Sequence, residues 1–400
     1  MKACGVVVEY NPFHNGHLYH LQKSKELTNA DCIIAVMSGN FLQRGEPAII
    51  DKFHRTKAAL AAGADIVIEL PYAYAVQSSE LFAKGALLSL NELGVSSICF
   101  GSESGEIEPF LTLITRLEEN KQVYDEMIKD LLKQGLSYPK ANSQALEKIG
   151  VHDIDMMKPN NILGFSYVQT ILTNKLPIKP FTIKRMSNDF HEQEITSNIA
   201  SATSIRKELM KHQLSEKVIQ SVPHCSIEQL NEYEKKTKKW HTWSDYFPFL
   251  IYQLFTKSSE QLAEIQGVEE GIEHRIKNVM NNVHSFEDLV EQVKTKRYTY
   301  VRLQRMFVHI LTNTKKEDIT SFMREESVPY IRLLGMNETG QKYLNIRKKD
   351  ITVPLISNLT RRYSELTYLD EKVTQVYYSI FPVRIRKKLL EQEFQLPIRK

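Results

Sequence analysis

Three histidines within seven residues, His14, His17 and His20, form the densest group of chemically active side chains in the chain. They follow an apolar run at residues 3–8, they flank a turn that contains Gly16, and they open a predicted helix. A helix N-terminus offers unpaired N–H groups to a phosphate, glycine lets the phosphate approach the backbone, and imidazole N–H groups can donate to its oxygens. The pattern therefore predicts a phosphate-binding turn.

A zinc site is the alternative function for these histidines, because His14 and His17 lie three residues apart. Zinc sites usually take cysteine or further histidine ligands, and no such set lies nearby, so we predict no metal site. The chain also lacks the G-x-x-x-x-G-K-[ST] and G-x-G-x-x-G patterns of two other nucleotide-binding turns. A solvated surface loop is disfavoured by the strand–turn–helix context.

A second candidate phosphate site begins a helix predicted at residues 201–212. Ser201 is expected to cap this helix, Thr203 and Ser204 add hydroxyl groups, and Arg206 can hold β- and γ-phosphates with both arms of its guanidinium. An ordinary capped helix with an exposed arginine is the alternative interpretation.

Further candidates stand where predicted strands and helices end or begin. Gly101 would let a nucleoside pack on the backbone, although a plain turn fits equally well. Asn160 either caps a helix or reads the adenine edge, and Arg185 ends a strand, which favours phosphate or ribose contact. The glycine-flanked segment 38–46 suits a lid or a pocket for a second substrate. Asp51, Lys52, His54 and Arg55 form one more candidate cluster, at a helix start.

The elements that must position these residues alternate in the front half. Continuous apolar strands separated by helices indicate a parallel sheet covered on both faces, with ligands beyond the carboxyl ends of the strands. After about residue 215 only helical patterns follow. We predict an α/β fold, with a Rossmann-like parallel-sheet domain at 1–214 and an all-α basic domain at 215–400. The strands are expected at residues 3–9, 31–38, 65–70, 95–100 and 178–185.

Composition and charge exclude several classes of protein. Of the 400 residues, 42% are hydrophobic and 25% charged, which is typical of globular chains and excludes a disordered or collagen-like protein. No apolar stretch is long enough to span a membrane, and four scattered cysteines indicate a reduced, cytoplasmic protein. Residues 201–400 carry 33 Lys+Arg against 25 Asp+Glu, a net charge of +8, and the front half carries −4. Such asymmetry suits a polyanionic partner, with chance as the alternative.

Two signatures and several longer strings resemble a known family. His14-Asn15-Gly16-His17 after a buried strand resembles the H-x-G-H signature of the nucleotidylyltransferase superfamily, and residues 199–206 approximate its I-S-S-T-x-x-R signature, with Ala202 in place of a serine. The bacterial tRNA(Met) cytidine acetate ligase family shows similar strings in the same order: GVVVEYNPFHNGH, SGNFLQRGEPAIIDKFHR, GADIVIELPYAYAVQSSELFAKGA, FGSE, KPNNILGFSY, IASATSIR and KTKRYTYVRLQRMFVHIL.

The resemblance implies a nucleotidylyltransferase (HUP) catalytic domain and a two-step reaction. ATP and acetate would form acetyl-adenylate, and the acetyl group would pass to N4 of the wobble cytidine of elongator tRNA(Met), giving N4-acetylcytidine. Mg²⁺ is expected with ATP, and no protein partner can be inferred. His14 and His17 would be catalytic. The implied ATP-binding residues are Val7, Val8, Glu9, Tyr10, Asn11, Pro12, Phe13, His14, Asn15, Gly16, His17, His20, Gly101, Asn160, Arg185, Ser201, Thr203 and Arg206.

If the partner is an RNA, we expect it to bind a segment of the back half that contains both basic and aromatic residues. Its cations suit phosphate contacts and its aromatic rings suit base stacking, although a solvated helix face is the alternative. Two other functions stay open, a small-molecule nucleotidylyltransferase and a non-enzymatic RNA-binding module. The candidate tRNA-binding residues are Lys294, Lys296, Arg297, Arg302 and Arg305.

Overall fold

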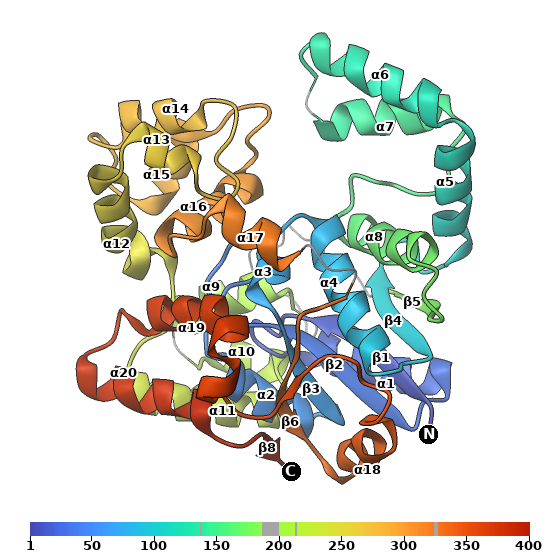
Figure 1. The fold of residues 1–400 in the computed structure, drawn as a ribbon, viewed down its shortest axis with the longest axis vertical. Helices are drawn as coiled ribbons and strands as arrows, with labels where there is room; N and C mark the ends of the chain where they lie inside the picture. Colours follow the sequence, from blue (N-terminus) through green and yellow to red (C-terminus); the bar gives the residue numbers. More distant parts are fainter. Residues whose placement is uncertain (137, 186–199, 213, 324–326) are drawn as a thin grey trace.

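The structure is a computed structural model that describes residues 1–136, 138–185, 200–212, 214–323 and 327–400. A twisted sheet lies at the centre with helices on both faces, and two groups of helices project beyond it on the same side (Figure 1). Both chain termini lie at the opposite side. None of the helices in these ranges combines the length and the apolarity needed to cross a bilayer.

The front half forms the parallel sheet that the apolar runs predict. β1 pairs with β2 and β4, β2 pairs with β3, and β4 pairs with β5, in every case parallel. All residues of β2 and β3 are buried, as expected for strands covered on both faces. The α/β prediction is confirmed. The strands are β1 (Ala3–Val8), β2 (Cys32–Ser38), β3 (Ile66–Leu70), β4 (Ser97–Ser102) and β5 (Lys179–Lys184).

Alternate side chains of the strands reach the two helix layers, because successive residues of a strand point to opposite faces. On β2, Ile33 and Ala35 join the core beneath α1 and α2, whereas Ile34 and Val36 join the core beneath α4 and α8. Two separate apolar cores therefore fix the sheet between its helices. The helices of these layers are α1 (Asn15–Thr28), α2 (Lys52–Ala61), α3 (Tyr72–Ala75), α4 (Ser79–Glu92), α8 (Pro159–Thr173) and α18 (Glu338–Arg347).

The back half is not all-α, which corrects the prediction. β6 (Ile331–Met336) pairs antiparallel with β3, and β7 (Leu355–Ile356) and β8 (Ile398–Arg399) pair parallel with β6. A short apolar run such as that of β6 cannot be told from a buried helix segment by its periodicity. The sheet therefore crosses residue 214, and the proposed division of domains there stays a prediction.

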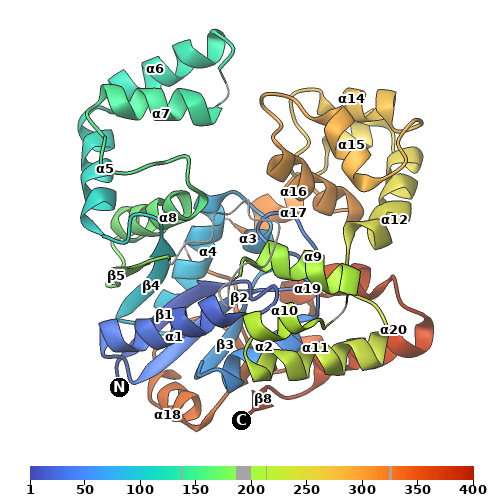
Figure 2. The same ribbon diagram turned by 180° about the vertical axis from the view of Figure 1, so that it is seen from behind.

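The first projecting group of helices is an arm inserted between β4 and β5 (Figure 2). Its helices are α5 (Glu108–Glu119), α6 (Lys121–Lys133) and α7 (Tyr138–Lys148).

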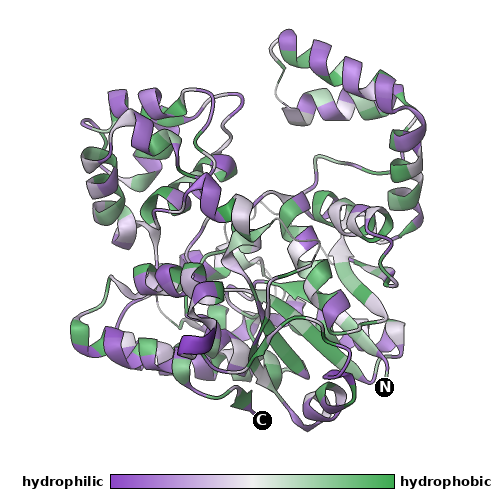
Figure 3. Ribbon diagram, in the orientation of Figure 1, coloured by the Kyte–Doolittle hydropathy of each residue, from purple (hydrophilic) through white to green (hydrophobic). Residues whose placement is uncertain are grey.

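The second group is a helical lobe, here defined as α12 to α17, whose apolar faces turn inward and whose outer faces are largely hydrophilic (Figure 3). Its core also contains Phe41, Ile49 and Tyr72 of the front half, so the lobe packs directly on the sheet domain.

The back-half helices are α9 (Ala202–His212), α10 (Glu216–Ser221), α11 (His224–Thr237), α12 (Trp243–Thr256), α13 (Ser259–Ala263), α14 (Ile272–Val279), α15 (Phe286–Val293), α16 (Tyr300–Leu311), α17 (Lys316–Phe322), η1 (Arg361–Tyr363), α19 (Ser364–Tyr378), α20 (Val383–Leu390) and η2 (Glu391–Phe394).

Candidate active site

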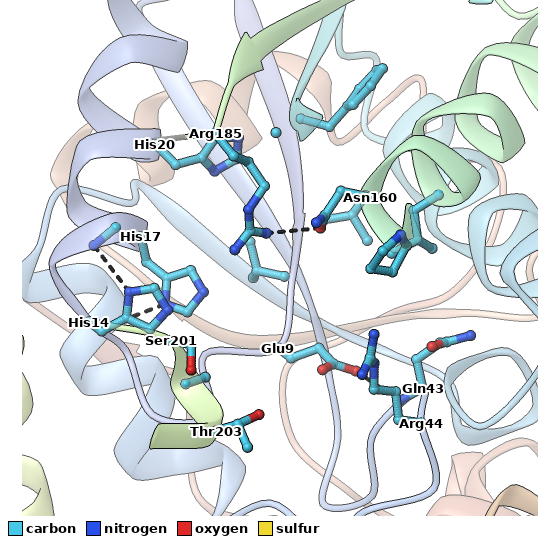
Figure 4. Close-up of a pocket in the computed structure, with 18 of the residues that line it drawn as sticks. Glu9, His14, His17, His20, Gln43, Arg44, Asn160, Arg185, Ser201 and Thr203 are labelled. Carbon is cyan, nitrogen blue, oxygen red and sulfur yellow. Dashed lines mark hydrogen bonds between the residues drawn. The ribbon is translucent and has the colours of Figure 1, made fainter. Parts of the chain in front are cut away.

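A cavity of about 310 Å³ lies at the carboxyl ends of β1, β4 and β5. This is the edge at which parallel α/β sheets bind their ligands. The N-termini of α1, α8 and α9 converge on it (Figure 4). The predicted ATP-binding residues that line it are Val7, Val8, Glu9, His14, Gly16, His17, His20, Gly101, Asn160, Arg185, Ser201, Thr203 and Arg206.

The other five predicted residues, Tyr10 to Phe13 and Asn15, do not line the cavity but build the turn beside it. The rings of Tyr10 and Phe13 pack edge to face in the core, with centroids 4.6 Å apart. Asn11, which precedes the cis bond to Pro12, accepts a hydrogen bond from the backbone N–H of Ile49 at 2.7 Å. Their contribution visible in the structure is to hold the histidine turn in place.

His14 and His17 close the N-terminus of α1 reciprocally. Nδ1 of His14 accepts from the backbone N–H of Gly16 at 3.0 Å, and Nδ1 of His17 accepts from the backbone N–H of His14 at 3.2 Å. The two rings stack with centroids 3.7 Å apart. Since both Nδ1 atoms accept hydrogen bonds, this network assigns the proton of each neutral ring to Nε2.

Burial and nearby cations keep these rings neutral. Burial lowers the pKa of His14 to about 3, with Arg185 and Arg206 adding to the effect. Burial also lowers the pKa of His17 well below its usual value, and that of His20 to about 4. The turn therefore presents neutral Nε2–H donors, which can hydrogen-bond developing charge on a phosphoryl group.

A chain of polar contacts joins β4, α8 and β5 on the opposite wall. Arg185 donates to Oδ1 of Asn160 at 2.8 Å, and Nδ2 of Asn160 donates to the Glu103 carboxylate at 2.6 Å. Glu103 also accepts the backbone N–H of Asn161 at 2.8 Å, so this carboxylate, and not the Asn160 side chain, closes the start of α8. The geometry orients Arg185 along the cavity wall.

Gly101 lies within β4 rather than after it, which corrects the predicted strand end at residue 100. A Cβ at this position would approach Cγ of Arg185 to 3.2 Å. Glycine therefore leaves room for the Arg185 side chain to lie against the strand.

The start of α9 confirms the predicted cap, since the backbone N–H of Ser204 donates to Oγ of Ser201 at 3.1 Å. Ile199, the first residue of the predicted signature, lies outside the described residues. Arg206 reaches the cavity but is already engaged, because it donates to the carbonyl of Asn11 at 2.9 Å and to Glu46 at 2.8 Å. Phosphates at this site would compete with those two oxygens.

Sequence reasoning missed much of the cavity wall. Arg44 and Glu46 line it from segment 38–46, for which only a general role in ligand binding was predicted. Glu9 accepts the backbone N–H of Gln43 at 2.8 Å, and burial raises the pKa of the Glu9 carboxyl group. The remaining unpredicted lining residues are mainly apolar and aromatic, a type that helical spacing alone assigns to the core: Phe82, Phe100, Leu163, Tyr167 and Ile183.

The cluster from Asp51 to Arg55 does not line the cavity. Arg55 is buried and donates to the carbonyls of Glu9, Ser38 and Gly39, so it ties together the ends of β1 and β2. The Lys52 ammonium lies between Glu69 of β3 and Glu393 near the C-terminus. The cluster thus positions the strand ends and does not form part of the candidate site.

The five predicted tRNA-binding residues lie around α16 in the helical lobe, and they do not line the cavity. Four of them have partners in the structure. Lys294 pairs with Glu291, Arg297 with Glu270 and Arg302 with Glu269, and Lys296 donates to the carbonyl of Gly135 in the arm. Arg305 differs from them, because within the described ranges no hydrogen bond or ion pair reaches its guanidinium.

Within the parts of the chain that the structure describes, no group of three or more His, Cys, Asp or Glu side chains is placed to hold a metal ion. The four cysteines are free thiols.

The model of the HIGH Nucleotidyl Transferase family matches residues 1–393. A protein of Oceanobacillus iheyensis named tRNA(Met) cytidine acetate ligase is 50% identical over 401 residues, covering 100% of both chains. Its namesake from Bacillus subtilis is 46% identical over 406 residues, covering 100% of this chain and 97% of the relative.

Two crystal structures of Thermotoga maritima TmcAL are similar over the whole chain at 34% sequence identity. The apo form superimposes with a TM-score of 0.90 and covers 100% of this chain and 99% of that one. The form bound with alpha-thio ATP gives a TM-score of 0.88 and covers 100% of both.

Proposed function

This chain belongs to the HIGH nucleotidyl transferase family and matches its tRNA(Met) cytidine acetate ligases over their full length, and from this premise we propose that it acetylates tRNA at the expense of ATP. The proposed reaction activates acetate as acetyl-adenylate and transfers the acetyl group to N4 of the wobble cytidine of elongator tRNA(Met). ATP binding is supported by the ATP-analogue complex of the Thermotoga maritima relative.

In the first step an acetate oxygen attacks the α-phosphorus of ATP, and the bond to pyrophosphate breaks. Nε2–H of His14 and of His17 donate to the α-phosphate oxygens as charge develops on them. The N-terminal N–H groups of α1 favour the same anion, and Gly16 leaves the backbone accessible to it. The two neutral histidines are the proposed catalytic residues of this step.

The rest of the nucleotide would lie along the two remaining helix starts. Ser201, Thr203 and Arg206 at the start of α9 would hold the β- and γ-phosphates, with Arg206 exchanging its present carbonyl and carboxylate partners for phosphate oxygens. Asn160, Arg185 and Gly101 would contact the nucleoside. Mg²⁺ is expected to arrive on the ATP phosphates, because the described residues offer no dedicated set of metal ligands.

In the second step N4 of cytidine attacks the acetyl carbon, the bond between that carbon and the AMP oxygen breaks, and N4 loses a proton. An exocyclic amine conjugated to a pyrimidine is a weak nucleophile, so the reaction needs the activated anhydride and close positioning. We propose that the cytidine binds on the side of the cavity away from the stacked histidines. Segment 38–46 and Glu9 form that side (Figure 4). Because ATP and tRNA(Met) are both cytoplasmic, the proposed reaction takes place in the cytoplasm.

The observation that supports this proposal most directly is the pair of neutral histidines that cap the N-terminus of α1, at the carboxyl end of β1. Its test is acetate-dependent exchange of labelled pyrophosphate into ATP. We expect exchange when acetate is present and none when acetate is omitted. Exchange that ignores acetate would refute the activation step.

A further inference from the structure

Within the described ranges, no hydrogen bond or ion pair reaches the guanidinium of Arg305. This residue lies on α16 and is partly buried, and each of the other four predicted tRNA-binding residues has a partner. Arg302, one turn earlier, pairs with Glu269 at 3.1 Å and lies over the ring of Tyr298. No comparable acceptor reaches Arg305 within the described part of the chain. A half-buried charge without a counterion is costly, which makes it a candidate site for an external anion.

The backbone brings Arg305 next to the cavity. Gly45, at φ +77°, packs so closely on α16 that a Cβ there would collide with the backbone of Gln304 and Arg305. The indole N–H of Trp243 on α12 donates to the carbonyl of Gly45 at 3.0 Å and fixes the same contact. Arg44, the preceding residue, lines the cavity. A cation of the helical lobe therefore stands beside a cation of the catalytic pocket.

The electrostatics agree with this placement. Burial lowers the pKa of Arg305 to about 10, and the nearby positive charges of Arg302 and Arg44 contribute in the same direction. Among the described residues, no Asp or Glu side chain forms an ion pair with the Arg305 guanidinium. The positive charge of Arg44, in contrast, interacts with the carboxyl groups of Glu9 and Glu46, which line the cavity. Arg305 is thus the member of this pair whose charge is left for a ligand.

We propose that Arg305, supported by Arg44, binds one backbone phosphate of the RNA at the mouth of the cavity and so holds the target nucleotide over the adenylate. This inference rests on the proposed function and deepens it, because it joins the helical lobe to the catalytic pocket through a single phosphate. Arginine suits the role, since its planar fork can hold two oxygens of one phosphate.

The phosphates of ATP are the other source of the same chemistry. Position favours the RNA, because the histidine turn and the start of α9 line the cavity whereas Arg305 stands outside its lining. The triphosphate already has two helix N-termini within the cavity, so a polynucleotide that enters from outside is the anion expected to pass Arg305.

The experiment measures binding of unmodified tRNA(Met) to the full chain at several salt concentrations, with Arg305→Gln beside wild type. Each lost phosphate contact removes about one counterion, so the slope of log K against log[salt] should fall by about 1 in magnitude. We expect affinity near physiological salt to fall about tenfold, and Arg305→Lys to recover part of it. Arg116→Gln, which removes an exposed arginine of α5, is the charge-matched control.

Separate measurements assign the source of the phosphate. Binding of ATP to Arg305→Gln is measured by calorimetry, and a loss of ATP affinity with unchanged tRNA affinity would overturn the inference. A salt slope equal to that of wild type, or equal losses in Arg116→Gln, would overturn it as well. Thermal unfolding shows whether Arg305→Gln is folded, and the Arg305→Lys result decides if it is not. Failure of the proposed function is distinct, because it would appear as absent acetylation in wild type.

Discussion

The backbone N–H of His14 donates to the ring of His17 at 3.2 Å, and the two rings stack with centroids 3.7 Å apart. This contact links helix capping to the proposed catalytic role of the two histidines. The nitrogen that caps the helix is Nδ1 in both rings, so Nε2–H remains for the substrate. The reciprocal capping by His14 and His17 therefore fixes the start of α1, the tautomer of both histidines and the direction of their Nε2–H donors.

Replacing His17 by asparagine separates its capping role from its proposed catalytic role. In His17→Asn the amide oxygen can still accept the His14 N–H, whereas the Nε2–H donor is gone. We expect acetate-dependent pyrophosphate exchange to fall about 100-fold or more, the usual loss for one transition-state donor, with a small change in unfolding temperature. Stopped exchange accompanied by global unfolding of the variant would favour a structural role instead.

The pH dependence follows from the lowered pKa values. Burial lowers the pKa of His14 to about 3 and the pKa of His17 well below its usual value, so we expect both donors to stay neutral from pH 5.5 to 8. We expect the exchange rate to show no loss through pH 6.5 as pH falls. The free energy of unfolding should nevertheless decrease below pH 6.5, because the unfolded chain binds protons that the folded chain excludes. An activity step near pH 6.5 that disappears in His17→Asn would contradict the assignment.

Substitutions of Asn160 test whether the polar contacts that orient Arg185 matter for nucleotide binding. Its Nδ2 donates to Glu103, so Asn160→Asp would set two carboxylates against each other at a distance of about 3 Å. Like charges this close cost on the order of 1–4 kcal/mol, depending on solvent screening. We expect the dissociation constant for ATP to rise about tenfold more in Asn160→Asp than in Asn160→Ala. Equal affinities of the two variants would show that the contact does not shape the nucleotide site.

Gly45 makes the contact between segment 38–46 and the helical lobe. Gly45→Ala places a methyl group in the backbone of α16 at a positive φ, and we expect a loss of about 2 kcal/mol or more in urea unfolding. Gly63→Ala is the matched control, since Gly63 also has a positive φ, of +112°, but no atom lies within 4 Å of its Cβ position. A loss of the same size in both variants would mean that backbone strain, and not the contact, explains the effect.

The sequence predicted those features whose causes are local. The run at β1, the histidine turn and the Ser201 cap each depend on residues within a few positions of one another, so type and spacing suffice to identify them. The same holds for the five parallel strands, although β4 runs two residues further than expected and thereby includes Gly101.

Features that depend on distant residues were missed. β6 joins the sheet by pairing with β3, more than 260 residues earlier in the chain, and its own six residues carry no sign of that partner. Phe82 and Tyr167 line the cavity from helices whose apolar spacing resembles any core face. Glu269, Glu270 and Glu291 neutralise much of the charge of the basic segment, and only the tertiary structure shows that no described residue pairs with Arg305.

In the proposed reaction the acetyl group of acetate reaches the wobble cytidine of tRNA(Met). Its most direct test incubates the protein with ATP, radiolabelled acetate and unmodified elongator tRNA(Met), digests the RNA and identifies the labelled nucleoside. We expect label in N4-acetylcytidine, dependent on ATP and lost in His17→Asn. Unlabelled tRNA, with pyrophosphate released only when a small nucleotide-like acceptor is supplied, would contradict it and identify a small-molecule nucleotidylyltransferase.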